Sequence, residues 1–134
     1  MEHLHTVLNH LLIGFGVALT PTNVLYGIVG VIFGTFVGAM PGIGAPSGIA
    51  MLLPLTFGMN PTSGIIMLAG IYYGSQYGGS ITSILVNVPG EASSVVTCLD
   101  GYQMALKGRA GAAMAVAAVG SFVAGTFGTI IIML

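Results

Sequence analysis

The sequence predicts an all-α integral membrane protein, a helical bundle in which broken, re-entrant segments interrupt the helices. Of its 134 residues, 55% are hydrophobic and 4% are charged, whereas an ordinary soluble domain carries roughly a quarter charged residues. The mean hydropathy is +1.03. No Asp, Glu, Lys or Arg lies between Glu2 and Glu91. Lipid favours such a stretch, because one charge at the bilayer centre costs about 2.5–3.5 kcal/mol.

Composition and motifs also exclude several functions. Two basic residues cannot neutralise a run of phosphates, so we expect no nucleic-acid partner. The sequence has no GxSxG, HExxH or paired cysteines, so we expect neither an enzyme nor a bound metal or cofactor. His3, His5 and His10 fit the wet end of a helix better than a metal site.

The first two predicted helices differ in length. Residues 4–19 are apolar but fall short of the ~20 residues needed to cross a bilayer, so they predict an interfacial helix. Thr20 and Pro21 form an N-cap followed by a first-turn proline, which predicts a spanning helix over 21–40.

Small residues recur at helical spacing in the predicted spans. Glycine every fourth residue leaves a smooth face that another helix backbone can approach closely, so we assign these glycines to helix packing. They are Gly30, Gly34 and Gly38 in one helix, and Gly70, Gly74 and Gly78 in another. Gly120, Ala124 and Gly128 repeat the pattern less strictly near the end of the chain.

A first interruption follows the helix over 21–40. Prolines and glycines crowd residues 40–48 and disfavour regular helix there. Apolar sequence resumes at once, without a charged loop. Irregular backbone with apolar flanks is typical of a break at membrane depth. Residues 41–57 therefore predict a re-entrant segment.

The next helix and a second interruption follow. Asn60 and Pro61 predict the start of a spanning helix over 61–77. Tyr72, Tyr73 and Tyr77 lie near its end and form either an aromatic belt or the wall of a polar site. Residues 78–90 place hydroxyls and an amide among apolar residues, and predict a second re-entrant segment.

The remaining polarity lies in residues 91–107. Their polar side chains follow helical steps and predict an amphipathic helix, with Glu91 at its start, where the helix dipole favours a carboxylate. Residues 110–134 predict a last span. Lys107 and Arg109 precede it and place that loop in the cytoplasm. The apolar end, without a polar tail, leads us to expect a fragment of a longer protein.

Several of these motifs, in this order, resemble the large membrane subunit of the bacterial tripartite tricarboxylate transporters, the TctA family. The resemblance runs from about Leu12 to Leu134 and implies that the chain is an N-terminal fragment of a longer transporter. It is carried by residues 41–44, 53–58, 69–74, 77–80, 82–85, 87, 89–90, 97 and 100–105. One departure is Ala45, where the family more often has proline, and it bears on the shape of the first loop.

The resemblance implies a multi-pass secondary transporter of the bacterial inner membrane, built as an inverted repeat of two related halves. It implies symport of citrate or related carboxylates with a coupling cation, Na⁺ or H⁺. The implied partners are the lipid bilayer, a periplasmic solute-binding protein and a small membrane subunit.

Residue chemistry and the resemblance lead to one hypothesis for the site. Broken helices in transporters aim half-helix N-termini at anions and unwound carbonyls at cations. We expect the two interruptions to line the substrate and ion site, and the lone aspartate on the polar stripe is a further candidate. The candidates are Gly42, Gly44, Ser47, Ser80, Thr82, Ser83, Asn87 and Asp100.

Two other readings of the same residues stay open. A channel-type subunit would use the same segments as a filter. A small structural subunit would only pack through its glycine faces, and its polar residues in these segments could be replaced freely.

Overall fold

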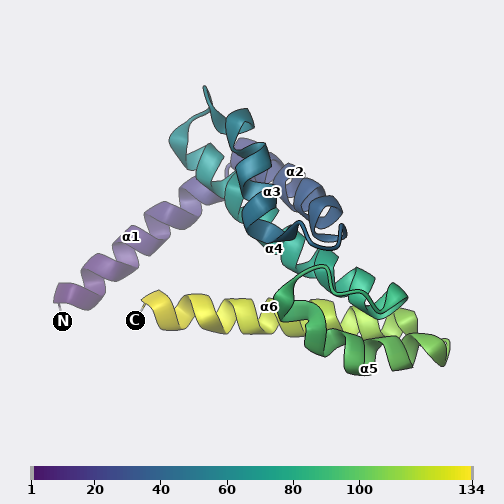
Figure 1. Cartoon of the computed structure of the whole chain (residues 1–134). Helices are drawn as coiled ribbons and strands as arrows, with labels where there is room; N and C mark the ends of the chain where they lie inside the picture. The colour runs from purple at the N-terminus through teal and green to yellow at the C-terminus, as the bar shows by residue number, and fades with distance from the viewer. Residues whose placement is uncertain (1, 134) are drawn as a thin grey trace.

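The computed structural model describes residues 2–133, and every regular element in that range is a helix. The elements are α1 (Glu2–Ala18), α2 (Pro21–Gly38), α3 (Gly44–Leu52), the 3₁₀ helix η1 (Leu53–Thr56), α4 (Pro61–Val86), the 3₁₀ helix η2 (Ala92–Ser94), α5 (Val95–Leu106) and α6 (Ala110–Met133). Figure 1 shows α3 lying beside α2 and α4, while α1 extends away from them.

Helices α2 and α4 form the central pair through reciprocal backbone contacts. Three glycines of α2 face carbonyls of α4, and three glycines of α4 face carbonyls of α2. A Cβ atom on any of the six would lie within 3.0 Å of a carbonyl oxygen of the facing helix, closer than real Cβ atoms approach. These glycines are Gly30, Gly34, Gly38, Gly70, Gly74 and Gly78, the six assigned to packing from their spacing.

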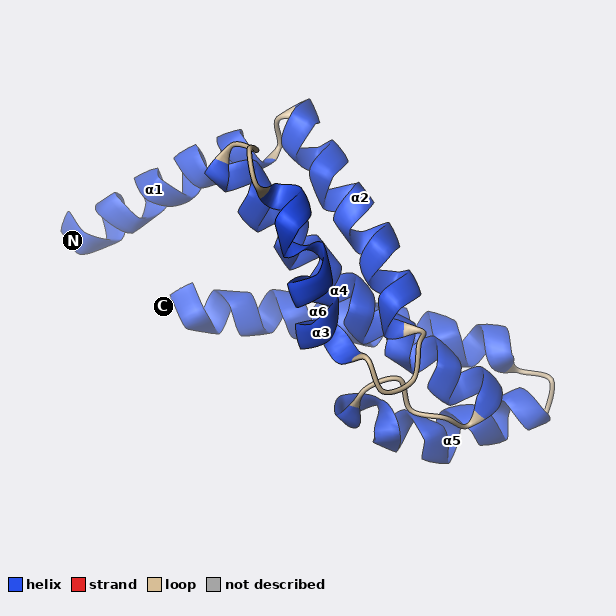
Figure 2. Cartoon of the chain, turned by 45° about the horizontal axis from the view of Figure 1, so that its top comes forward, coloured by secondary structure: helices blue, strands red, loops and turns tan. Residues whose placement is uncertain are grey.

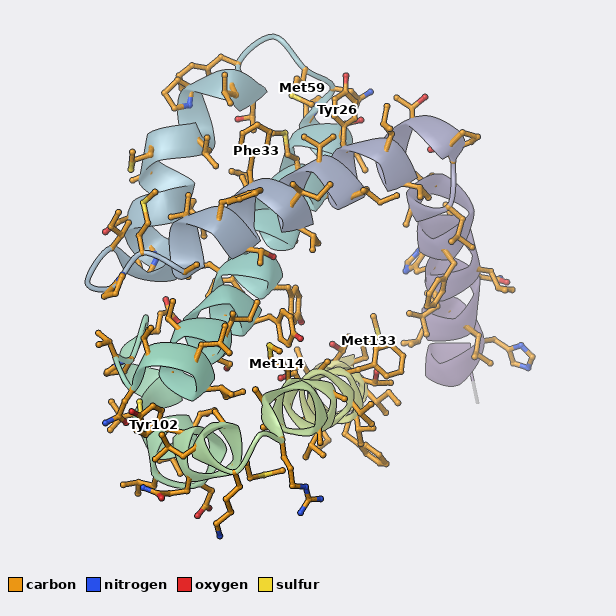
Figure 3. All side chains as sticks on the ribbon, turned by 90° about the vertical axis from the view of Figure 1, so that its right-hand side faces the viewer. Tyr26, Phe33, Met59, Tyr102, Met114 and Met133 are labelled. Atoms are coloured by element: carbon orange, nitrogen blue, oxygen red, sulfur yellow. The ribbon has the colours of Figure 1, made fainter. Side chains whose placement is uncertain are left out.

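The chain is an all-α membrane protein, as its composition predicts. Helices α2 and α6 are long and apolar enough to cross a membrane by length and composition. Helix α4 has 26 residues, more than the ~20 that cross a bilayer. In α6 only Ala113 is buried, and most of its large apolar side chains are exposed. Figure 3 shows side chains on several sides of α6. The predicted span over 110–134 matches α6, except that Leu134 lies outside the described residues.

Helix α4 is longer than the sequence predicts. The predicted span ends at Tyr77, but the helix continues to Val86, so residues 78–86 are helical and not a re-entrant break. The sequence predicts the break from hydroxyls and an amide among apolar residues. In the structure Gly78 and Gly79 pack closely against neighbouring backbone, which compensates for their low helix propensity.

The first interruption is also shorter than predicted. Helix α3 begins at Gly44, inside the segment 40–48 for which the sequence disfavours helix. Pro46 lies in the first turn of α3, where a helix does not use the backbone N–H that proline lacks. Irregular backbone is therefore confined to residues 39–43.

Side-chain capping is present at the start of α4 but not at the start of α2. Asn60 caps α4 as predicted, because its side-chain oxygen accepts a hydrogen bond from the Thr62 amide at 3.0 Å. The prediction for Thr20 is wrong in part: it precedes α2, but its hydroxyl donates to the Val17 carbonyl oxygen at 2.8 Å and caps no amide. The predicted helix over 91–107 is η2 followed by α5.

Candidate functional site

The two irregular connections, between α2 and α3 and between α4 and α5, meet in space. Figure 2 shows both as tan loops running next to each other. A Cβ atom on Gly90 would lie within 3.0 Å of the Gly38 carbonyl oxygen and of the Gly79 Cα. The second connection therefore contacts the end of α2 and the body of α4 through backbone alone.

Glu91 links the second connection to the first turn of α3. The Ala45 amide donates a hydrogen bond to the Glu91 Oε1 oxygen. Glu91 also forms a capping box with Ser94, whose Oγ accepts from the Glu91 amide at 3.2 Å. Ala45 is fully buried and Ser94 is 3% exposed. One carboxylate thus lies at the starts of two helical segments, where the helix dipole favours negative charge.

Of the predicted residues of the first connection, Gly44 lies beside this carboxylate. Gly44 has φ +69°, and a Cβ atom there would lie 3.3 Å from the Glu91 Oε1 oxygen. Gly42 also has positive φ, at +89°, with open space where a Cβ would stand. Ser47 is exposed on α3.

The predicted hydroxyls of the second connection are on the last turns of α4 and bond to their own helix. Thr82 Oγ1 donates to the Gly79 carbonyl oxygen at 3.1 Å, and Ser83 Oγ donates to the same oxygen at 2.8 Å. Ser80 Oγ donates to the Gln76 carbonyl oxygen at 3.3 Å. Ser83 is fully buried, whereas Ser80 and Thr82 are half-buried.

Asn87 ends α4 and is exposed. It has φ +56°, in the left-handed region, and is the one residue other than glycine with positive φ in the described chain. Asparagine tolerates this conformation better than most residues do. The Asn87 amide therefore stands at the start of the second connection.

Asp100 lies apart from the connections. It lines a hollow of about 270 Å³ between α4, α5 and α6, together with Thr97 and Gly101 of α5. Around Glu91, the structure brings Gly44 together with the contact formed by Gly79, Thr82 and Gly90. Asp100 lies outside this group.

The tyrosines of α4 border a different hollow. Tyr73 and Tyr77 line an open groove of about 810 Å³ between α1, α2, α4 and α6. The Tyr77 hydroxyl donates to the Met114 carbonyl oxygen at 3.4 Å, and Figure 3 labels Met114 on α6. Tyr72 and Tyr73 pack edge to face, with ring centroids 5.9 Å apart.

Comparison with known proteins decides the family. The model of the family described as "Tripartite tricarboxylate transporter TctA family" matches residues 24–134. The chain belongs to this family. A curated protein of Agrobacterium vitis, described as an uncharacterized 52.8 kDa protein in the TAR-I ttuC' 3' region, is 58% identical over 126 residues. That alignment covers 94% of this chain and 25% of the relative, so the chain spans about a quarter of the relative's length. No solved structure matches the chain.

Three polar features of this TctA-family chain were missed by sequence reasoning. Glu91 was placed only at the start of a helix, although as the one acidic residue between Glu2 and Asp100 it could have been singled out. Ser75 is fully buried, and its Oγ has no hydrogen-bond partner among the described residues. The third feature is a buried pair, in which Ser63 Oγ donates to Asn23 Oδ1 at 2.6 Å.

Proposed function

We propose that this chain forms part of the permease subunit of an ion-gradient-driven secondary transporter that takes up tricarboxylates such as citrate. The proposed transporter lies in the bacterial inner membrane, crosses it several times, and works with a periplasmic solute-binding protein and a small membrane subunit. The family match over residues 24–134 carries the proposal. Because the chain spans 25% of the relative's length, the proposal concerns a permease of which these residues are one part.

In this proposal, the substrate and coupling cation bind where the two connections meet. Backbone amides beside Gly42 and Gly44 can approach a carboxylate closely, because neither glycine has a side chain. At the second connection, the proposal is supported by the half-buried hydroxyl of Thr82 and the exposed amide of Asn87. Ser47 and Ser80 lie on the flanking helices α3 and α4. Ser83 would contribute through its position in the last turns of α4.

Charge at this place favours a coupling cation. Neither connection carries a basic residue, and Glu91 adds a negative charge between them. A substrate carboxylate beside Glu91 would be repelled unless a cation or other residues compensated for the two charges. Simultaneous binding of Na⁺ or H⁺ with the substrate satisfies this requirement. Asp100, in its separate hollow, has no part in this site.

Uptake of radiolabelled citrate by the complete transporter tests the function. We expect saturable uptake that requires both the solute-binding protein and a cation gradient, measured in proteoliposomes with each component omitted in turn. Flux that does not saturate and needs no binding protein would support a channel-type subunit. Absence of any carboxylate uptake in the complete system would overturn the proposal.

One observation favours a second candidate, a structural role in helix packing. The hydroxyls of Ser80, Thr82 and Ser83 are all satisfied by carbonyl oxygens of α4, as is common for serine and threonine within helices. A purely structural subunit would tolerate replacement of these hydroxyls together with the Asn87 amide, with no change in uptake.

A further inference from the structure

Glu91 joins two helical segments that are far apart in the sequence. Its carboxylate accepts the hydrogen bond of the Ala45 amide, 46 positions earlier in the chain. The acceptor is a carboxylate oxygen, and a hydrogen bond with a charged partner is roughly twice as strong as a neutral one. This bond connects α3, which follows the first connection, to Glu91, which ends the second connection.

The first turn of α3 offers few other backbone donors for holding it in place. Pro46 has no N–H. The Ile43 amide already donates to the Met40 carbonyl oxygen at 3.3 Å, inside the first connection. Among the hydrogen bonds of the described residues, the Ala45 amide is the donor of this turn that reaches a distant part of the chain, and Glu91 is its acceptor.

The loop that carries Glu91 is itself fixed. Ser94 Oγ donates to the Glu91 carbonyl oxygen at 2.8 Å and accepts from the Glu91 amide at 3.2 Å. Gly90 lies against Gly38 and Gly79 so closely that no side chain fits between them. Because its backbone cannot shift freely, Glu91 presents its carboxylate to α3 from a rigid support.

We propose that Glu91 is a positioning residue that fastens the start of α3 to the α4–α5 connection. It keeps the two connections at a fixed spacing, so that groups on both can contact one substrate. The role rests on the proposed transport function. It depends on the oxygen acceptor and on the length of the side chain, because the bond must span from the loop to the Ala45 amide.

Three substitutions separate these requirements in the complete transporter. Glu91→Gln keeps an oxygen acceptor at the same reach and removes the charge. Glu91→Asp keeps the charge and shortens the side chain by one methylene. Glu91→Ala removes the acceptor. The matched control is Ser93→Ala, which removes an exposed hydroxyl of the same loop, bonded to Gln76 of α4, but leaves the capping box and the Ala45 bond in place.

Two readouts apply to each variant. Hydrogen exchange of the purified transporter, followed by mass spectrometry, reports how firmly residues 43–52 are held. Citrate uptake reports KM and the maximal rate separately, at membrane levels matched by immunoblot. A variant that is merely less stable is present at a lower level in the membrane or has a lower maximal rate. A variant in which a connection is misplaced has a higher KM.

We expect Glu91→Ala to speed exchange at the Ala45 amide about tenfold and to raise KM several-fold, as loss of a charge-assisted bond predicts. Glu91→Asp should behave similarly, and Glu91→Gln should stay within about threefold of the wild type. Ser93→Ala should leave exchange in α3 and the KM unchanged.

Unchanged exchange at Ala45 in Glu91→Ala, or a KM that does not move while exchange rises, would overturn the positioning role. Equal loss in Glu91→Gln and Glu91→Ala would overturn it too, because the charge and not the bond would then matter. If the wild type took up no carboxylate, the proposed function would fail, while the exchange data would still decide whether Glu91 holds α3.

Discussion

The α2–α4 pair and helix α6 have the same kind of sequence but lie in opposite environments, one closely packed and the other exposed. Both are apolar and place small residues at four-residue spacing. In the α2–α4 pair every one of these glycines lies against the facing backbone. In α6, Gly120 and Gly128 have no atom of another element within 4 Å, and the neighbouring Phe122 is 76% exposed. Small-residue spacing thus permits close packing without specifying it.

The difference lies in the partner helix. On α2, Gly34 meets the carbonyl of Ile71, and on α4, Gly74 meets the carbonyl of Val31, so each helix receives the other's backbone. Helix association in lipid relies on such close packing, because the hydrophobic effect does not drive apolar helices together there. In the described chain, no stripe of small residues on another helix faces the small residues of α6.

The largest expected effect tests the packed side of this comparison. Gly34→Ala would place a Cβ atom within 3.0 Å of the Ile71 carbonyl oxygen, so the two backbones must separate. We expect a loss of about 3 kcal/mol or more, at the upper end of overpacking effects. The level of transporter in the membrane and its melting temperature in detergent measure this loss.

Gly120→Ala is the matched control, since its added Cβ meets nothing within 4 Å. We expect its stability to stay level or rise by up to ~1 kcal/mol, from the better helix propensity of alanine. Equal damage from Gly34→Ala and Gly120→Ala would remove the distinction between the two regions.

An intermediate effect is expected where α2 and α4 share a polar contact. Asn23 bonds to Ser63 of α4 and, through Nδ2, to the Val17 carbonyl oxygen at the end of α1. Asn23→Leu leaves the buried Ser63 hydroxyl without this partner and should cost about 1–3 kcal/mol. In the double variant with Ser63→Ala, part of this loss should return. Strict additivity in a thermal-melt cycle would show that the pair is not coupled.

The smallest expected effect concerns Ser75, whose carbonyl faces Gly38 in the same interface. Its buried hydroxyl lacks a hydrogen-bond partner within residues 2–133, and such a group is destabilising. Ser75→Ala should therefore raise stability by roughly 1 kcal/mol, measured as a shift in melting temperature. A clear drop in melting temperature would mean that the hydroxyl has a partner after all.

How far the sequence predicts the fold depends on whether the signal is local. The start of α4 was predictable, because Asn60 and Pro61 act within one turn. The end of α4 was not, because Gly78 and Gly79 are stabilised in the helix by residues from α2 and the second connection. Pro46 misled in the same way, since its place in the first turn of α3 removes its usual penalty.

The candidate site was predictable only in part. Crowded glycines and prolines predicted the first connection, and polar side chains among apolar residues predicted the region of the second. Nothing local to Glu91 pointed to Ala45, and their bond depends on how α3 folds back toward α4. The hydroxyls of Ser80, Thr82 and Ser83 were assigned to an irregular segment and lie on a helix instead.

Citrate uptake by a variant of the complete transporter tests the central claim most directly. Thr82→Val with Asn87→Gly removes two polar groups near the junction of the connections, while glycine keeps the left-handed backbone that Asn87 adopts. The control is Thr126→Val with Thr129→Val, whose hydroxyls bond to carbonyls of their own helix, as Thr82 does. At equal membrane levels we predict that uptake falls about tenfold in the first pair and is unchanged in the control. Wild-type uptake kinetics in the first pair would contradict the account.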